Sequence, residues 1–156
     1  MREILFRGKP LPRYEHETHD KWVYGGLVHQ TDWYGDKVDD YYIIDGTGTH
    51  DYDIGFEYKV FPESVGQYTG FKDCNGEKIF EGDVVKTKDT THTIMFYIVF
   101  KNGSFYANAV LESENYLSCH ISFLMNHFLY NGFQHEIVGN VFDDKQMLED
   151  YKEKKE

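Results

Sequence analysis

Residues 66–87 read GQYTGFKDCNGEKIFEGDVVKT, and residues 93–111 read TIMFYIVFKNGSFYANAVL. In each segment an Asn-Gly pair, Asn75-Gly76 or Asn102-Gly103, separates two runs that resemble β-strands. Asn-Gly is the strongest short signal for a β-hairpin because both residues tolerate positive φ angles. The two segments therefore predict two antiparallel hairpins.

Further strands are expected around these hairpins, separated by tight turns. Short strands at this spacing are typical of a small antiparallel barrel, and the turn before Val84-Val85 is similar to one in SH3-like barrels. We therefore expect a mainly β fold with an SH3-like barrel at residues 63–142. The expected strands are Gly66–Lys72, Lys78–Phe80, Asp83–Thr87, Thr93–Phe100, Ser104–Leu111 and Glu136–Phe142.

An N-terminal β lobe is expected at residues 1–62, with a boundary near the turn-forming Pro62. Gly25-Gly26 lies inside a strand-like run and suggests a bulge or a close approach between backbones. Residues 33–36 predict a turn, and residues 46–55 predict a surface loop. The expected strands of this lobe are Arg2–Phe6, Lys21–His29 and Tyr41–Asp45.

One or two short helices are expected in addition to these lobes. The lobes and helices together should form a single compact unit. Residues 121–129 place apolar side chains at helical spacing, although a strand is an open alternative there. Residues 143–156 predict a C-terminal helix, because Asp143 is a suitable N-cap and lysines lie near the end.

The strand Ile94–Phe100 is apolar on both of its alternating faces. A strand of this kind cannot leave either face in water without becoming prone to aggregation. We expect one face to fill the barrel. The other face should lie against the helix at 121–129, the N-terminal lobe or a second subunit.

The 156 residues carry a formal net charge of -11, and residues 14–57 hold eleven acidic side chains against Lys21 and Lys37. An acidic chain is repelled by phosphate, because affinity for a nucleic-acid backbone comes mainly from Lys and Arg. No apolar run approaches the ~20 residues of a membrane-spanning helix, and no secretory signal is recognisable. We therefore expect a cytoplasmic protein with no membrane segment.

No residues predict a catalytic, metal or cofactor site. His16 and His19 are one residue too close for the zinc pattern, which places two histidines four residues apart on a helix. An acidic group at residues 45–57 could gather around a hard cation, but its spacing differs from that of an EF-hand. A surface loop is the simpler interpretation of that group, which comprises Asp45, Asp51, Asp53 and Glu57.

Residues 60–86, VFPESVGQYTGFKDCNGEKIFEGDVVK, closely resemble the YopX family, whose members are small proteins found mainly in prophages and phages of Gram-positive bacteria. REILFRG at 2–8, KWVYG at 21–25 and IVGNVF at 137–142 extend the resemblance. It implies a phage or prophage context in a bacterial host. It implies no established activity, cofactor or set of site residues.

The absence of catalytic groups, the acidity and the surplus of apolar strand surface favour an accessory protein that acts through protein–protein contacts, as a homo-oligomer and with a phage or host protein. One alternative is a nucleic-acid-associated barrel, because the chain begins with four basic residues in its first thirteen. Another is an acidic inhibitor of a host DNA-binding enzyme, formed by residues 14–57. The candidate contact residues are Trp22, Tyr24, Tyr68, Tyr97 and Val99.

Overall fold

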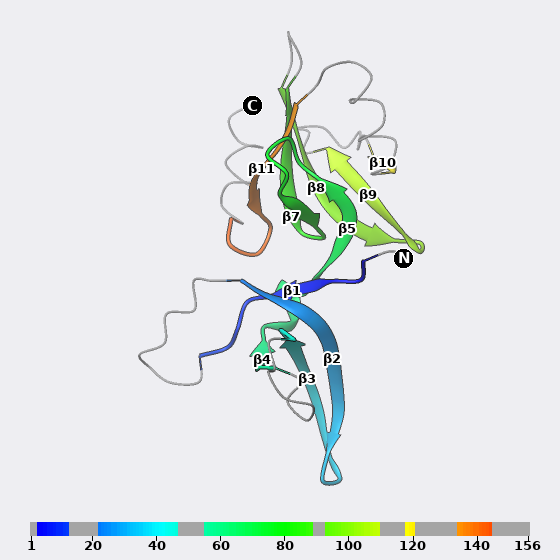
Figure 1. Cartoon of the computed structure of the whole chain (residues 1–156). Helices are drawn as coiled ribbons and strands as arrows, with labels where there is room; N and C mark the ends of the chain where they lie inside the picture. The colour runs from blue at the N-terminus through cyan, green and yellow to red at the C-terminus, as the bar shows by residue number, and fades with distance from the viewer. Residues whose placement is uncertain are drawn as a thin grey trace. The chain divides into compact units, whose positions relative to one another are not determined.

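The computed structural model describes residues 3–12, 22–46, 55–88, 93–109, 118–120 and 134–144. These residues form β-strands and one short 3-10 helix, η1, and contain no α-helix (Figure 1). The prediction of a mainly β fold is confirmed. The elements are β1 (Phe6–Gly8), β2 (Val23–Trp33), β3 (Asp36–Ile44), β4 (Glu57–Val60), η1 (Pro62–Ser64), β5 (Gly66–Lys72), β6 (Lys78–Phe80), β7 (Asp83–Lys88), β8 (Thr93–Lys101), β9 (Ser104–Ala109), β10 (Ser118–His120) and β11 (Gln134–Asn140).

The strands form two antiparallel sheets. One has six strands in the order β4-β3-β2-β1-β5-β6, and the other has five in the order β10-β9-β8-β7-β11. Each sheet ends in two edge strands, so the predicted closed barrel is not found among the described strands. At residues 81–83 the chain leaves β6, turns at Gly82 with a φ of 82°, and starts the second sheet with β7, so the strands expected in one barrel are divided between two sheets.

The chain divides into two compact units, Met1–Tyr68 and Thr69–Glu156. The division lies inside β5, while Pro62, where the sequence suggested a boundary, begins η1 within the first unit. The helix predicted at 121–129 lies outside the described residues. So does the helix predicted at 143–156, apart from its first two residues, Asp143 in a turn and Asp144.

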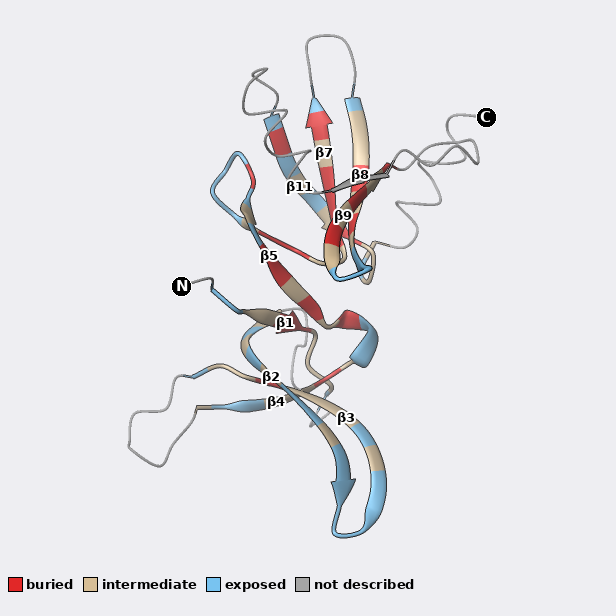
Figure 2. Ribbon diagram, turned by 90° about the vertical axis from the view of Figure 1, so that its right-hand side faces the viewer, coloured by how far each residue is buried: buried red, intermediate tan, exposed pale blue. Residues whose placement is uncertain are grey.

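The core of the second unit comes from alternate residues of its strands. Phe96 and Ile98 of β8 are buried against the buried residues of β9, where Ile98 pairs with Ala107 (Figure 2). One face of the apolar strand is therefore buried, as expected, although in the core of this unit and not in the predicted barrel. Tyr97 and Val99 on its other face are half-buried. The full buried cluster is Ile79, Val85, Phe96, Ile98, Phe105, Ala107 and Ala109.

Both predicted Asn-Gly turns are present in this unit. Asn102 and Gly103 have φ angles of 50° and 76°, as a two-residue hairpin loop requires. At the other turn Gly76 has a φ of 84°, and the Gly76 N–H donates to the Asp73 carbonyl over 3.1 Å. Both hairpin predictions are therefore confirmed.

Two aspartates hold the β5–β6–β7 region through backbone N–H groups. Asp73 Oδ1 accepts from the N–H of Asn75 at 2.8 Å and of Glu77 at 2.9 Å. Asp83 is only 1% exposed, and its Oδ2 accepts the Phe80 N–H at 2.7 Å. Their carboxylates therefore shape the turns at the two ends of β6.

In the first unit, residues 9–11 cover the outer edge of β4. The Leu11 N–H donates to the Lys59 carbonyl over 2.7 Å, and the Phe61 N–H donates to the Lys9 carbonyl over 2.9 Å. Pro10 bridges Val60 between these two bonds. Strand β4 is consequently closed to further pairing along these residues.

Gly25 lies where β2 passes from one partner strand to the other. It pairs with Phe6 of β1, and the next residue, Gly26, pairs with Ile44 of β3. A Cβ on Gly25 would lie 1.8 Å from the Ile44 carbonyl oxygen, whereas one on Gly26 would meet nothing within 4 Å. The close backbone approach predicted for the Gly25-Gly26 pair is therefore confirmed at Gly25.

Candidate interaction surface on the β2–β3 hairpin

The far end of the β2–β3 hairpin pairs only with itself. Strand β1 covers β2 only at Val23–Gly25, and β4 covers β3 only at Tyr41–Ile44. Residues 30–40, which we call the arm, therefore form a two-stranded ribbon without a third strand among the described residues (Figure 1). In Figure 2 its end is coloured as exposed on both strands. An isolated ribbon is only marginally stable, so the arm depends on its turn and on the sheet at its base.

The turn of the arm places a tyrosine in an unfavourable backbone conformation. Tyr34 and Gly35 have φ angles of 49° and 91°, which define a two-residue hairpin loop in which Asn-Gly is the preferred pair. Asp32 Oδ1 accepts the Gly35 N–H at 3.1 Å and closes the loop. The predicted turn at residues 33–36 is confirmed, but Tyr34 holds a position that disfavours bulky side chains.

The aromatic rings at the turn are left in solvent. Tyr34 is 95% exposed and Trp33 is 58% exposed, and their rings pack edge to face with centroids 5.4 Å apart. Tyr34 therefore buries almost nothing that could offset its backbone strain. A strained residue with no packing role is a reasonable starting point for a functional hypothesis.

The arm is protected against strand addition. A register shift between Gln30 and Asp32 sets two residues of β3, Val38 and Asp39, against Thr31 alone and so forms a bulge in β3. Exposed charges follow on both strands at Asp32, Asp36, Lys37 and Asp39. Bulges and charges are the usual devices that keep an edge strand from pairing with another chain. The arm is thus suited to contacts made by side chains rather than by its backbone.

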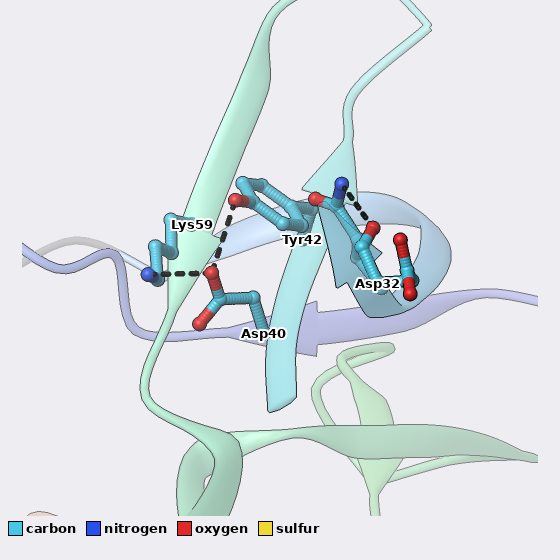
Figure 3. A network of polar contacts seen from close by, with 5 residues as sticks. Asp32, Asp40, Tyr42 and Lys59 are labelled. Atoms are coloured by element: carbon cyan, nitrogen blue, oxygen red, sulfur yellow. Dashed lines mark hydrogen bonds and ion pairs between the residues drawn. The ribbon is translucent and has the colours of Figure 1, made fainter. Parts of the chain in front are cut away.

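One face at the base of the hairpin carries apolar groups around an ion pair. Tyr24 is 46% exposed and Val28 is 41% exposed, and Val28 pairs with the half-buried Tyr42. Asp40 Oδ2 lies 2.8 Å from Lys59 Nζ and 3.5 Å from the Tyr42 hydroxyl, the latter at the long limit of a hydrogen bond (Figure 3). The hydrogen bond with Asp40 raises the pKa of Lys59 above its ordinary value. We call this surface, formed by Tyr24, Val28, Asp40, Tyr42 and Lys59, the outer face.

The opposite face ties the arm to the sheet. The His29 ring stacks on Tyr41 with centroids 4.3 Å apart, and His29 Nε2 lies 2.7 Å from Asp39 Oδ1. Beyond this stack the face continues into the core of the first unit through Ile43, which pairs with Leu27 and is fully buried. The arm therefore grows from a packed base.

The predicted contact residues belong to both units and differ in exposure. Tyr24 is exposed on the outer face, but Tyr68 is only 6% exposed and belongs to the core, which corrects its assignment to a contact surface. Tyr68 lies on a buried part of β5, and the sequence pattern did not indicate which residues of this strand are buried. Tyr97 and Val99 belong to the second unit, away in sequence from the hairpin.

Trp22 serves as a platform for cations of its own chain. The Arg7 guanidinium carbon lies 4.4 Å from the Trp22 ring centroid, and Lys9 Nζ lies 5.5 Å from it. Trp33 and Tyr34 were not among the contact residues predicted from the sequence. A bulky aromatic directly before glycine at a turn, where asparagine is the usual residue, was the signal that could have identified them.

Within the described ranges, no three His, Cys, Asp or Glu side chains are arranged to hold a metal ion. Asp45 accepts the Phe56 N–H at 2.9 Å through Oδ1, while Asp51, Asp53, His16 and His19 lie outside those ranges. The same part of the chain holds no helix with the length and apolar composition of a membrane span.

These features describe a mainly β protein of two antiparallel sheets that offers an exposed hairpin surface. The chain belongs to the YopX family, because the family described as YopX protein matches residues 14–149. Protein EF1440 from Enterococcus faecalis has a similar crystal structure, with a TM-score of 0.51, 23% sequence identity, and coverage of 94% of this chain and 98% of that one. That similarity concerns the fold. No curated protein matches the sequence.

Proposed function

We propose that this chain is a non-catalytic accessory protein of a phage or prophage, and that it binds another protein through the β2–β3 hairpin. The observation that carries the proposal is Tyr34, which is 95% exposed in a left-handed conformation at the tip of the arm. The phage context is supported by membership of the YopX family.

The size of the aromatic tip suits a binding hot spot. Tyrosine and tryptophan each bury about 150–250 Å² in a contact, and both are enriched among the residues that dominate interface energies. A standard interface covers roughly 800 Å² on each partner, so the sides of the arm must contribute the remaining area. Their polar and charged side chains fit the rim of such an interface.

The buried state of Arg7 supports a protein partner over nucleic acid. Arg7 is one of the four basic residues at the start of the chain, and its guanidinium is buried beside the Trp22 ring. A buried guanidinium is poorly placed to neutralise phosphate, which is the main source of affinity for nucleic acid.

Tyr34→Asn separates binding from folding. Asparagine tolerates positive φ better than tyrosine, so the variant should be more stable than the parent by about 1 kcal/mol and should nevertheless lose its partner. Stability is measured by urea unfolding, and binding by capture from a lysate of the bacterial host with tagged full-length protein.

Phe56→Asn is the matched control, because Phe56 is also an exposed aromatic of the first unit but lies outside the arm. It should capture the same proteins as the parent. Equal capture by the parent and by Tyr34→Asn would remove the support for this function.

A second candidate is self-association through the outer face. Its Asp40–Lys59 ion pair leaves the exposed Tyr24 and Val28 in locally neutral surroundings, which two copies of an acidic chain could bring together. Val28→Lys should then lower the mass measured by light scattering after size exclusion. Val138→Lys, at an exposed valine of β11, is the control and should keep the parental mass. A monomeric parent would exclude this candidate.

A further inference from the structure

We propose that the partner of the arm is a protein with a basic, arginine-lined surface, an inference that rests on the proposed function. The arm carries four aspartates and a single lysine, Lys37. One of the four, Asp40, is paired with Lys59. Of the other three, Asp39 contacts His29 and Asp32 accepts the Gly35 N–H. Asp32, Asp36 and Asp39 are all exposed beside or behind the aromatic tip and give it a negative field.

The aromatic rings supply the second part of the recognition. The face of an aromatic ring attracts cations, and a guanidinium can stack on the ring while it donates hydrogen bonds to a carboxylate. Tyr34 is exposed enough for such stacking, and Asp36 pairs across the hairpin with Trp33. The tip therefore places ring faces and carboxylates next to one another.

The same chain already uses this chemistry. Arg7 lies over the Trp22 ring, and Lys101 Nζ lies 4.6 Å from the Tyr106 ring centroid. At the tip of the arm the rings are present, but the arm has a single cation, Lys37. Lys37 lies opposite Asp32 in the register of the two strands. An arginine from a partner would complete the arrangement.

Charge also argues against the other occupants. A second copy would bring an equally acidic arm to a chain whose formal net charge is -11. Nucleic acid would bring phosphates to the aspartates, and like charges in an interface select against a partner. A basic protein surface, such as one that contacts nucleic acid in other settings, has the complementary charge.

The test uses tryptophan fluorescence of the full-length chain. The sequence contains two tryptophans, so Trp22→Phe leaves Trp33 as the single reporter while an aromatic ring remains beside Arg7. This protein is titrated with a short polyarginine peptide, with polylysine of equal length, and with a neutral glycine-serine peptide. We expect saturable binding of polyarginine, weaker binding of polylysine, and none of the neutral peptide.

Two neighbouring substitutions should act in opposite directions. Asp36→Asn should weaken polyarginine binding roughly two- to fivefold, and Lys37→Gln should tighten it by a similar factor, as expected for exposed charges. A folding defect cannot produce both changes. Glu63→Gln, which removes an equal charge from η1, is the control and should leave the affinity unchanged.

Several results would overturn the inference: no saturable binding of polyarginine, equal binding of the two cationic peptides, or equal effects of Asp36→Asn and Glu63→Gln. A change in Trp33 fluorescence with a DNA oligonucleotide in place of the peptides would also do so. Lysate capture could depend on Tyr34 and yet be insensitive to ~0.5 M salt and to Asp36→Asn. In that case the proposed protein-binding function is supported, and the inference of a basic partner is wrong.

Discussion

Gly25→Ala should unfold the base of the β2–β3 hairpin, with a loss of about 3 kcal/mol or more in the free energy of unfolding. The added Cβ would lie 1.8 Å from the Ile44 carbonyl oxygen and 2.5 Å from its carbonyl carbon. Both are backbone atoms, so no side-chain rotation relieves the clash. Strand β2 would have to move away from β3 at the point where Gly26 pairs with Ile44.

Gly26→Ala is the control for this prediction. A Cβ there meets nothing within 4 Å, so the substitution should change stability by less than about 1 kcal/mol. Urea unfolding of both variants gives the comparison, and near-ultraviolet circular dichroism reports on Trp33 and the tyrosines of the hairpin. Similar melting behaviour of the two variants would contradict the close approach at Gly25.

Asp83→Ala should be the most damaging substitution in the second unit, at about 3 kcal/mol. Asp83 is 1% exposed, and its carboxylate accepts the N–H of the buried Phe80. The same turn is held by Gly82, whose N–H donates to the Ile98 carbonyl and whose carbonyl accepts the Val141 N–H, each at 2.8 Å. Loss of the carboxylate therefore loosens the turn between β6 and β7, which is also hydrogen-bonded to Ile98 of β8 and to Val141.

Asp83→Asn keeps an acceptor oxygen in the same place and should cost less than Asp83→Ala. Thermal melting of the two variants beside the parent measures the difference. If alanine and asparagine are equally tolerated, the hydrogen bond to Phe80 does not hold the turn.

The local features of the fold could be predicted because each depends on a few neighbouring residues. Gly76 and Gly103 take positive φ angles at the predicted hairpin turns, and Gly25 sits at the predicted close approach. The buried side of β8, with Phe96 and Ile98, followed from alternation along one strand. The barrel did not follow, because closure depends on which distant strands meet at the sheet edges.

The candidate site was only partly accessible from the sequence. Tyr24 was expected to be exposed, but the burial of Tyr68 depends on strands that lie far from it along the chain. The left-handed conformation of Tyr34 is established by its φ of 49°, since many residues are compatible with a turn when the backbone angles are unknown.

The central place of β1 makes the first sheet dependent on the direction of protein synthesis. Strand β1 pairs on one side with residues 23–25 and on the other with Gly66 and Gln67, which are made about forty residues after Gly25. At about 5–20 residues per second, the ribosome needs roughly 2–8 s to add that length. The hairpin is local and can form during this interval, whereas one edge of β1 stays open until β5 has emerged. A chaperone that recognises unpaired strands would therefore meet this chain at the open edge of β1, before the second unit has been made.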